Sequence, residues 1–228
     1  MSEVAAEHAL SSSVGDYLKA IWFLGGAEAA STKDLAERLS VAPASVTNML
    51  GRLREMGLVD YERYYGATLT ARGRAEALRI VRRHRLIETL LLEHLEYPWQ
   101  EVHAEAERLE HAVSDRFTER LAEFLRHPDH DPHGDPIPTA EGQLEPEKAT
   151  PLGSAAIGEW LRISRVSNED PAVLAYLGER GLGPGCMIAV EEANEAGAVI
   201  TVRSDSGDAH TLSETLARSI FVDGASRS

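Results

Sequence analysis

Apolar positions recur with helical spacing through three short stretches at the start of the chain. The first begins at Ser13 and ends at the glycines 25–26, the second opens with the polar segment 31–34, and the third extends from Ala44 to Gly57. A polar capping residue before such a stretch and a glycine after it are typical of helix ends. The pattern predicts three helices, and the last two, joined by a tight turn, form a helix-turn-helix.

Residues 58–70 are rich in β-branched and aromatic types around one glycine, which predicts a hairpin in the position of the wing of a winged helix. A long helix is expected from Thr70 to about Leu95, and a second helical stretch from Trp99 through Leu125. Because a short turn joins these two helices, we expect them to pack antiparallel.

The last part of the chain has short apolar stretches separated by glycine-bearing turns, a pattern typical of a small β-barrel. The stretches lie at 157–163, 187–190, 199–202 and 219–222, with one or two helical turns expected at 171–177. Residues 139–155 are rich in Gly, Pro, Glu and Ala without lasting periodicity, which predicts a linker.

The charge of the chain is unevenly distributed. The net charge is −14, but residues 1–85 hold 12 Lys and Arg against 10 Asp and Glu, whereas residues 86–228 hold 11 against 27. This asymmetry indicates a neutral-to-basic binding module attached to an acidic body.

The start of the predicted third helix carries small polar side chains, which in a winged helix face base edges in the major groove. The predicted DNA contacts are Ser45, Thr47 and Asn48 to bases, Pro43 and Ala44 to thymine methyl groups, and Arg52, Arg54 and Arg63 to phosphates. An ordinary three-helix domain with a polar surface is the alternative, and the hairpin directly after the helix argues against it.

Residues 103–111 contain the most distinctive chemistry of the chain. If this stretch is helical, His103, Glu107, Glu110 and His111 fall within an arc of about 100°, while Glu105 points away. A solvated acidic face is the alternative, but imidazoles in register with carboxylates favour a divalent transition metal.

Further histidines lie on both sides of that stretch. His84 and Glu88 form an i, i+4 pair on the preceding helix, and antiparallel packing would bring them toward His103. Three others, His127, His130 and His133, lie in a loop rich in Pro, Gly and Asp, where we expect solvent exposure. The single cysteine, Cys186, excludes an internal disulfide and a thiolate zinc cluster.

No basic segment followed by an apolar run opens the sequence, and nowhere do 18 consecutive apolar residues occur. We therefore expect a cytoplasmic protein without a membrane partner.

Five short motifs together resemble the diphtheria toxin repressor and manganese transport regulator family of metal-dependent transcriptional repressors, over essentially the whole chain. The motifs are Gly15 to Leu18, Val41 to Met49, Arg83 to Glu88, Val102 to His111 and Gly134 to Pro138. The resemblance implies a mainly α fold with small β parts: an N-terminal winged helix-turn-helix, a helical dimerisation domain and a C-terminal SH3-like (FeoA-like) β-barrel.

The domain boundaries expected from this resemblance follow the composition of the chain. They are 1–72 for the DNA-binding domain, 73–138 for the dimerisation and metal-binding domain, 139–155 for the linker and 156–226 for the SH3-like domain.

Carried over residue by residue, the resemblance also implies two metal sites. The primary, activating site would comprise Asp16, Glu107, Glu110 and His111. The ancillary site would comprise His84, Glu88 and His103, with Glu169 or Asp170 as a ligand from the C-terminal domain.

Two departures from the family patterns matter, at three positions in all. Iron-type members have methionine and cysteine where this chain has Asp16 and Glu107, and carboxylates in place of sulfur favour Mn²⁺ over Fe²⁺. A manganese-type member with a binuclear site has glutamate where this chain has Lys19, so two separated sites are expected here.

These features predict a homodimeric repressor, and not an enzyme, that binds operator DNA when Mn(II) or Fe(II) occupies its sites. Asp16 belongs to the DNA-binding module, whereas its expected partner ligands belong to the next domain. A metal ion held by both would fix the position of the recognition helix in each subunit, which lowers the cost of placing two such helices at two half-sites of DNA. One alternative is a metal-dependent hydrolase, since residues 107–111 are similar to an inverted zincin motif with Glu107 in place of the first histidine. A metal buffer without DNA binding is another, and it would leave Asn48 and its neighbours unexplained.

Overall fold

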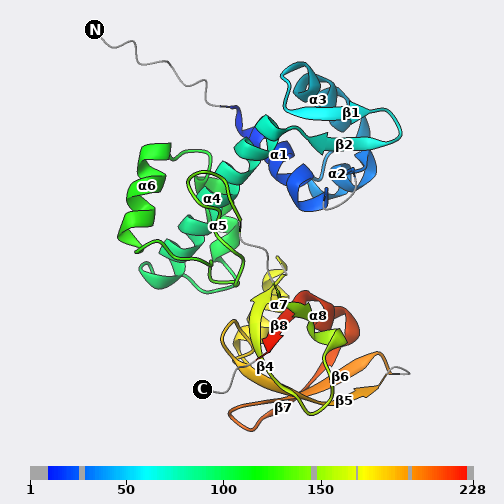
Figure 1. The fold of residues 1–228 in the computed structure, drawn as a ribbon, viewed down its shortest axis with the longest axis vertical. Coiled ribbons are helices and arrows are strands. Elements are labelled where there is room, and N and C mark those ends of the chain that lie inside the picture. Colours follow the sequence, from blue (N-terminus) through cyan, green and yellow to red (C-terminus); the bar gives the residue numbers. More distant parts are fainter. Residues whose placement is uncertain (1–9, 26–28, 145–147, 168, 195–196, 225–228) are drawn as a thin grey trace. The chain divides into compact units, whose positions relative to one another are not determined.

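The computed structural model describes residues 10–25, 29–144, 148–167, 169–194 and 197–224 (Figure 1). The predicted helix end at Gly26 lies outside these residues. The chain divides into two compact units. The first comprises Met1–Arg83, Glu110–Ala112 and Pro138–Gln143, and the second comprises His84–Leu109, Val113–Ile137 and Leu144–Ser228.

The first unit contains the predicted helix-turn-helix and wing. Its elements are α1 (Ser12–Leu24), α2 (Thr32–Arg38), α3 (Pro43–Glu55) and the antiparallel strands β1 (Val59–Glu62) and β2 (Gly66–Leu69). The Ser31 side chain caps α2 by accepting a hydrogen bond from Asp34 N, as the capping pattern predicted. Leu18, Leu35 and Leu50, one from each helix, are fully buried in a common core, so the three helices pack as one domain.

A long helix, α4 (Ala71–Glu93), begins in the first unit and ends in the second. Thr70 caps it: the Thr70 hydroxyl oxygen accepts a hydrogen bond from Gly73 N at 3.1 Å. Two further helices follow, α5 (Val102–Leu109) and α6 (Asp115–Phe124). Apolar side chains from all three pack together in the second unit, among them Leu86, Val102 and Leu121.

The prediction of one continuous helix from Trp99 through Leu125 is wrong. The chain stops being helical after Leu109, and Ser114 starts a new helix because its hydroxyl oxygen accepts a hydrogen bond from Phe117 N at 3.2 Å. Glu110 and His111 therefore lie in the turn after α5, and the four predicted metal ligands do not share one helical face.

The rest of the second unit contains an antiparallel sheet of six strands in the order β3-β8-β4-β5-β6-β7, with Figure 1 showing α8 beside β8. Its elements are β3 (Thr150–Pro151), the 3-10 helix η1 (Leu152–Ser154), β4 (Trp160–Val166), α7 (Pro171–Gly178), β5 (Met187–Asn194), β6 (Val199–Ser204), β7 (Ala209–Ser213), α8 (Glu214–Ser219) and β8 (Ile220–Gly224). Together they form the SH3-like domain.

Four of these elements, β3, η1, β7 and α8, have no counterpart in the sequence pattern. Strand β7 buries only Leu212, so it lacks a clear apolar alternation. Strand β3 has two residues and lies in the segment whose composition predicts a linker; it is held by pairing with Phe221 and Val222 of β8.

None of the helices within the described ranges is both long and apolar enough to cross a membrane.

Gly73 provides a test of the packing between α4 and the wing. A methyl group at this position would lie 1.9 Å from the backbone oxygen of Leu58, which also accepts a hydrogen bond from Thr70 N. We expect Gly73→Ala to destabilise the winged helix by about 3 kcal/mol, because backbone atoms must shift to accommodate it. Urea unfolding, followed by the amide NMR signals of α3, measures this effect.

Gly51→Ala is the control, since no atom lies within 4 Å of the added methyl group. It should stabilise α3 by about 0.5–1 kcal/mol through helix propensity. Equal free energies of unfolding for Gly73→Ala and Gly51→Ala would contradict the close approach of Gly73 to Leu58.

Candidate DNA interface and metal centres

The first turns of α3 present the predicted DNA-contacting side chains to solvent. Val46 and Leu50 are buried on one face of the helix, whereas Ser45, Asn48 and Arg52 are exposed on the other. Pro43 occupies the first helical turn, and its backbone oxygen accepts a hydrogen bond from the Thr47 hydroxyl at 3.1 Å. Also exposed are Pro43, Ala44, Thr47, Arg54 and Arg63.

The tip of the wing adds two side chains that the sequence analysis did not select. Tyr64 and Tyr65 are 88% and 75% exposed, and the Arg63 guanidinium lies 5.1 Å from the centre of the Tyr64 ring. Their position in a hairpin turn next to Arg63 is the signal that could have identified them.

Asp16, Glu110 and His111 form the first cluster of candidate metal donors, within the first unit. The Nε2 atom of His111 lies 2.7 Å from Asp16 Oδ1 and 3.2 Å from Glu110 Oε1. One donor atom from each residue lies within 4.8 Å of the others, as ligands of a shared ion would. Gly15 makes this approach possible, because a methyl group there would lie 2.9 Å from His111 Cε1.

Burial and charge pairing set the electrostatics of this cluster. The Glu110 side chain is fully buried, and its Oε1 atom also accepts a hydrogen bond from Lys19 Nζ at 2.6 Å. The hydrogen bond with Asp16, followed by that with Glu110, raises the pKa of His111 to about 9. In the metal-free protein this imidazole is protonated at neutral pH, and its proton must leave before a metal binds.

His84, Glu88 and His103 form a second cluster, within the second unit. His84 and Glu88 lie one turn apart on α4, and their Nε2 and Oε1 atoms are 2.9 Å apart. His103, at the start of α5, places its Nδ1 atom 3.1 Å from the same Glu88 oxygen and 3.0 Å from His84 Nε2. Burial alone would raise the pKa of Glu88, but the three imidazoles of His84, His103 and His133 outweigh it and hold that pKa well below its ordinary value.

The other oxygen of Glu88 faces a group that the sequence analysis missed. His133 was expected in solvent with His127 and His130; those two are exposed, but His133 is 6% exposed and its Nδ1 atom lies 3.9 Å from Glu88 Oε2. The Nε2 atom of His133 is buried without a hydrogen bond within the described residues. Glu88, Asp131 and His133 thus form a further group of three convergent donors.

The loop around His133 is ordered by backbone contacts. Asp131 Oδ1 accepts hydrogen bonds from the backbone amides of His133 and Asp135, at 2.8 and 3.0 Å. Burial, reinforced by the carboxylates of Glu88 and Asp135, raises the pKa of Asp131 to about 8. The His133 backbone oxygen accepts a hydrogen bond from Val166 N of β4, which fixes the loop against the SH3-like domain.

The remaining predicted ligands lie elsewhere. Glu107 Oε1 is 3.7 Å from His103 Nε2, so within the second unit it pairs with the second cluster. Asp170 caps α7 by accepting a hydrogen bond from Ala172 N at 2.9 Å, and Glu169 is exposed. Within the described residues neither of the last two belongs to a group of three convergent metal donors.

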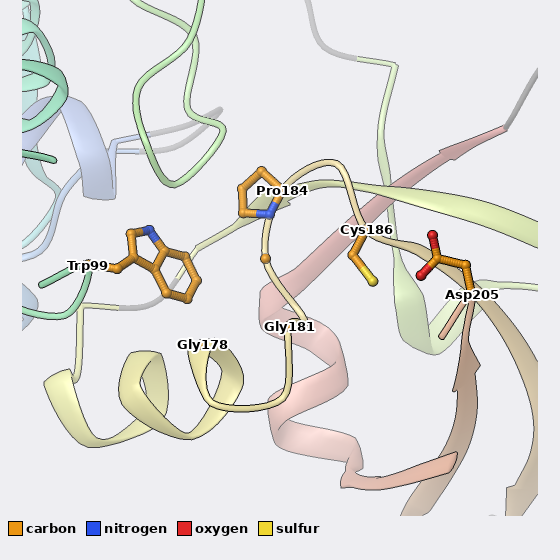
Figure 2. A pocket seen from close by; sticks show the side chains of 7 residues that line it. Trp99, Gly178, Gly181, Pro184, Cys186 and Asp205 are labelled. Atoms are coloured by element: carbon orange, nitrogen blue, oxygen red, sulfur yellow. The ribbon is translucent and has the colours of Figure 1, made fainter. Parts of the chain in front are cut away.

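A cavity of about 360 Å³ lies beside Trp99, whose ring also stacks on His133 at 5.3 Å. Figure 2 shows Trp99 facing the turn that carries Gly181 and Pro184, with Cys186 and Asp205 on the other side. Burial raises the pKa of the Cys186 thiol, so it stays protonated and is a poor nucleophile or metal ligand.

Three family models match successive parts of the chain. Residues 9–67 match the N-terminal DNA-binding domain of iron-dependent repressors, residues 70–139 match their metal-binding and dimerisation domain, and residues 150–224 match the FeoA domain.

Similar proteins cover most of the chain. The iron-dependent repressor IdeR of Mycobacterium leprae is 30% identical over 83% of this chain and 86% of its own length. The diphtheria toxin repressor of Corynebacterium efficiens is 32% identical over 83% of this chain and 85% of its own length. A solved manganese-dependent transcriptional repressor in complex with manganese is 41% identical, with a TM-score of 0.85 over 93% of this chain and all of that one.

The domains and the two clusters define a DNA-binding regulator that depends on a divalent metal. The chain belongs to the family of the iron-dependent repressors and the diphtheria toxin repressor, and it is a metal-dependent transcriptional repressor. The expected winged helix, dimerisation domain and SH3-like domain are confirmed, as are the DNA and dimer partners. Membership of a repressor family argues against the two alternative functions, a metal-dependent hydrolase and a metal buffer without DNA binding.

Proposed function

We propose that this repressor responds to Mn²⁺, held at two separate sites. The primary site is built on Asp16, Glu110 and His111, and the ancillary site is built around Glu88. The donors of the ancillary site are Glu88 with His84 and His103, extended by Asp131 and His133. Glu107 stays an expected primary ligand, and Glu169 or Asp170 an expected ancillary one, on the family resemblance.

The observation that carries the choice of metal is the donor set. Every group of three convergent donors within the described residues consists of carboxylate oxygens and imidazole nitrogens, and sulfur is absent from them. Such donors suit Mn²⁺, whereas thiolate and thioether donors suit softer ions. The names of the relatives divide between iron and manganese, and the 41% identical structure is named as a manganese-dependent repressor in complex with manganese.

The position of Asp16 connects metal binding to DNA binding. Asp16 lies on α1, which shares a core with α2 and α3, so the recognition helix moves with α1. A bound divalent cation would neutralise the facing carboxylates of Asp16 and Glu110. Asp16 and His111 then hold α1 to the segment Glu110–Ala112, which reduces the cost of placing two recognition helices at two half-sites of DNA.

Asp16→Asn tests the metal dependence. We expect it to raise the Mn²⁺ concentration needed for DNA binding at least about tenfold, because the amide is a weaker ligand without charge. The measurement is fluorescence anisotropy on a duplex selected from a random library by the Mn²⁺-loaded protein, with Mn²⁺, anaerobic Fe²⁺ and Zn²⁺ compared.

Asp60→Asn, which changes an exposed side chain of β1 in the same domain, is the matched control and should keep the metal response of the natural protein. A response to Fe²⁺ at lower free concentration than to Mn²⁺ would refute the choice of metal. DNA affinity that does not change on addition of any of the three ions would refute the role of this protein as a metal sensor.

Asn48→Ala tests the base contacts. We expect a loss of about 1–3 kcal/mol in affinity for the selected duplex, with little loss for random DNA, because Asn48 is exposed where α3 reads bases. Arg52→Ala should instead weaken binding to both duplexes and lower the salt dependence by about one ion, as a phosphate contact does. Uniform loss from Asn48→Ala would show that this side chain does not read bases.

A further inference from the structure

Lys19 is an unusual constituent of the primary cluster. It lies on α1 one turn after Asp16, and only 7% of the residue is exposed. Lysine is almost never buried unless its charge is paired. Its Nζ atom lies 2.6 Å from Oε1 of Glu110, whose side chain is fully buried. The fold therefore brings the side-chain amine of a buried lysine to the carboxylate proposed to bind the metal.

A second positively charged group lies close to the same oxygen atom of Glu110. His111 Nε2 lies 3.2 Å from Glu110 Oε1, so the ammonium and the imidazole converge on one atom of the cluster. Glu88 in the ancillary cluster is paired differently, since its ion-pair partners within the described residues are imidazoles alone. An imidazole becomes a metal ligand on losing its proton, whereas an ammonium has no lone pair to offer.

We propose that Lys19 is a built-in competitor for the metal: its ammonium neutralises Glu110 in the metal-free protein and raises the Mn²⁺ concentration at which the primary site fills. This inference rests on the proposed function of Asp16, Glu110 and His111 as a metal site. Two cations near one buried oxygen repel each other, and low solvent exposure weakens the screening of that repulsion. Lys19 thus sets the response threshold of the repressor without being a ligand.

Lys19→Met in the full chain tests the proposal, because methionine preserves the length and packing of the side chain and removes its charge. We expect Mn²⁺ to bind the primary site about tenfold more tightly, a change of about 1.4 kcal/mol. The measurement is the electron paramagnetic resonance signal of free Mn²⁺ during titration. Thermal unfolding should show a less stable metal-free protein and a larger increase in Tm on adding Mn²⁺.

Two variants serve as controls. Lys33→Met removes the same charge from an exposed side chain that lies 3.7 Å from Glu37, and it should leave Mn²⁺ affinity unchanged. Lys19→Arg keeps the charge and should bind Mn²⁺ no more tightly than the natural protein. If Lys19→Met fails to fold, Lys19→Gln is measured in its place, with the same expectation.

Unchanged or weaker Mn²⁺ binding in the neutral variants would overturn the proposal and show that Lys19 only positions Glu110. The proposed function fails separately. It fails if the natural protein binds Mn²⁺ and Asp16→Asn leaves that binding intact, whatever Lys19 does.

Discussion

Two buried glutamates determine the charge of both candidate metal sites. The residues Glu88 and Glu110 are 2% and 0% exposed, and an ionised carboxylate removed from water is stable only beside opposite charge or hydrogen-bond donors. The fold surrounds each with such groups: His84, His103 and His133 at Glu88, and Lys19 and His111 at Glu110. A divalent cation would meet the same requirement with greater charge, so its binding would stabilise both regions.

Local patterns in the sequence were sufficient to predict the features that depend on interactions between residues close in the chain. The capping residues Ser31 and Thr70 mark helix starts that the structure contains, and the pair of His84 and Glu88 lies one turn apart on α4 as its spacing predicts. The contact between Asp16 and His111 joins residues 95 positions apart. No helical period reaches so far, so that expectation depended on the family resemblance and not on spacing.

Tertiary contacts decided what the sequence could not show. The loop of His133 looks solvated by composition, yet Gly134 adopts a φ of +86° and passes close to Ser164, a path that a side chain there would block. This path and the bond from Val166 N bury His133 beside Glu88. The end of α5 was missed because the cap at Ser114 competes with an apolar pattern that continues beyond it.

Our proposal places Mn²⁺ at two sites, one bounded by Asp16, Glu110 and His111 and one by Glu88 and the imidazoles around it. Anomalous diffraction from crystals grown with Mn²⁺, recorded on both sides of the manganese absorption edge, tests this most directly. We expect one anomalous peak at each cluster. Peaks confined to exposed histidines such as His127 and His130, with none at Glu110, would contradict it.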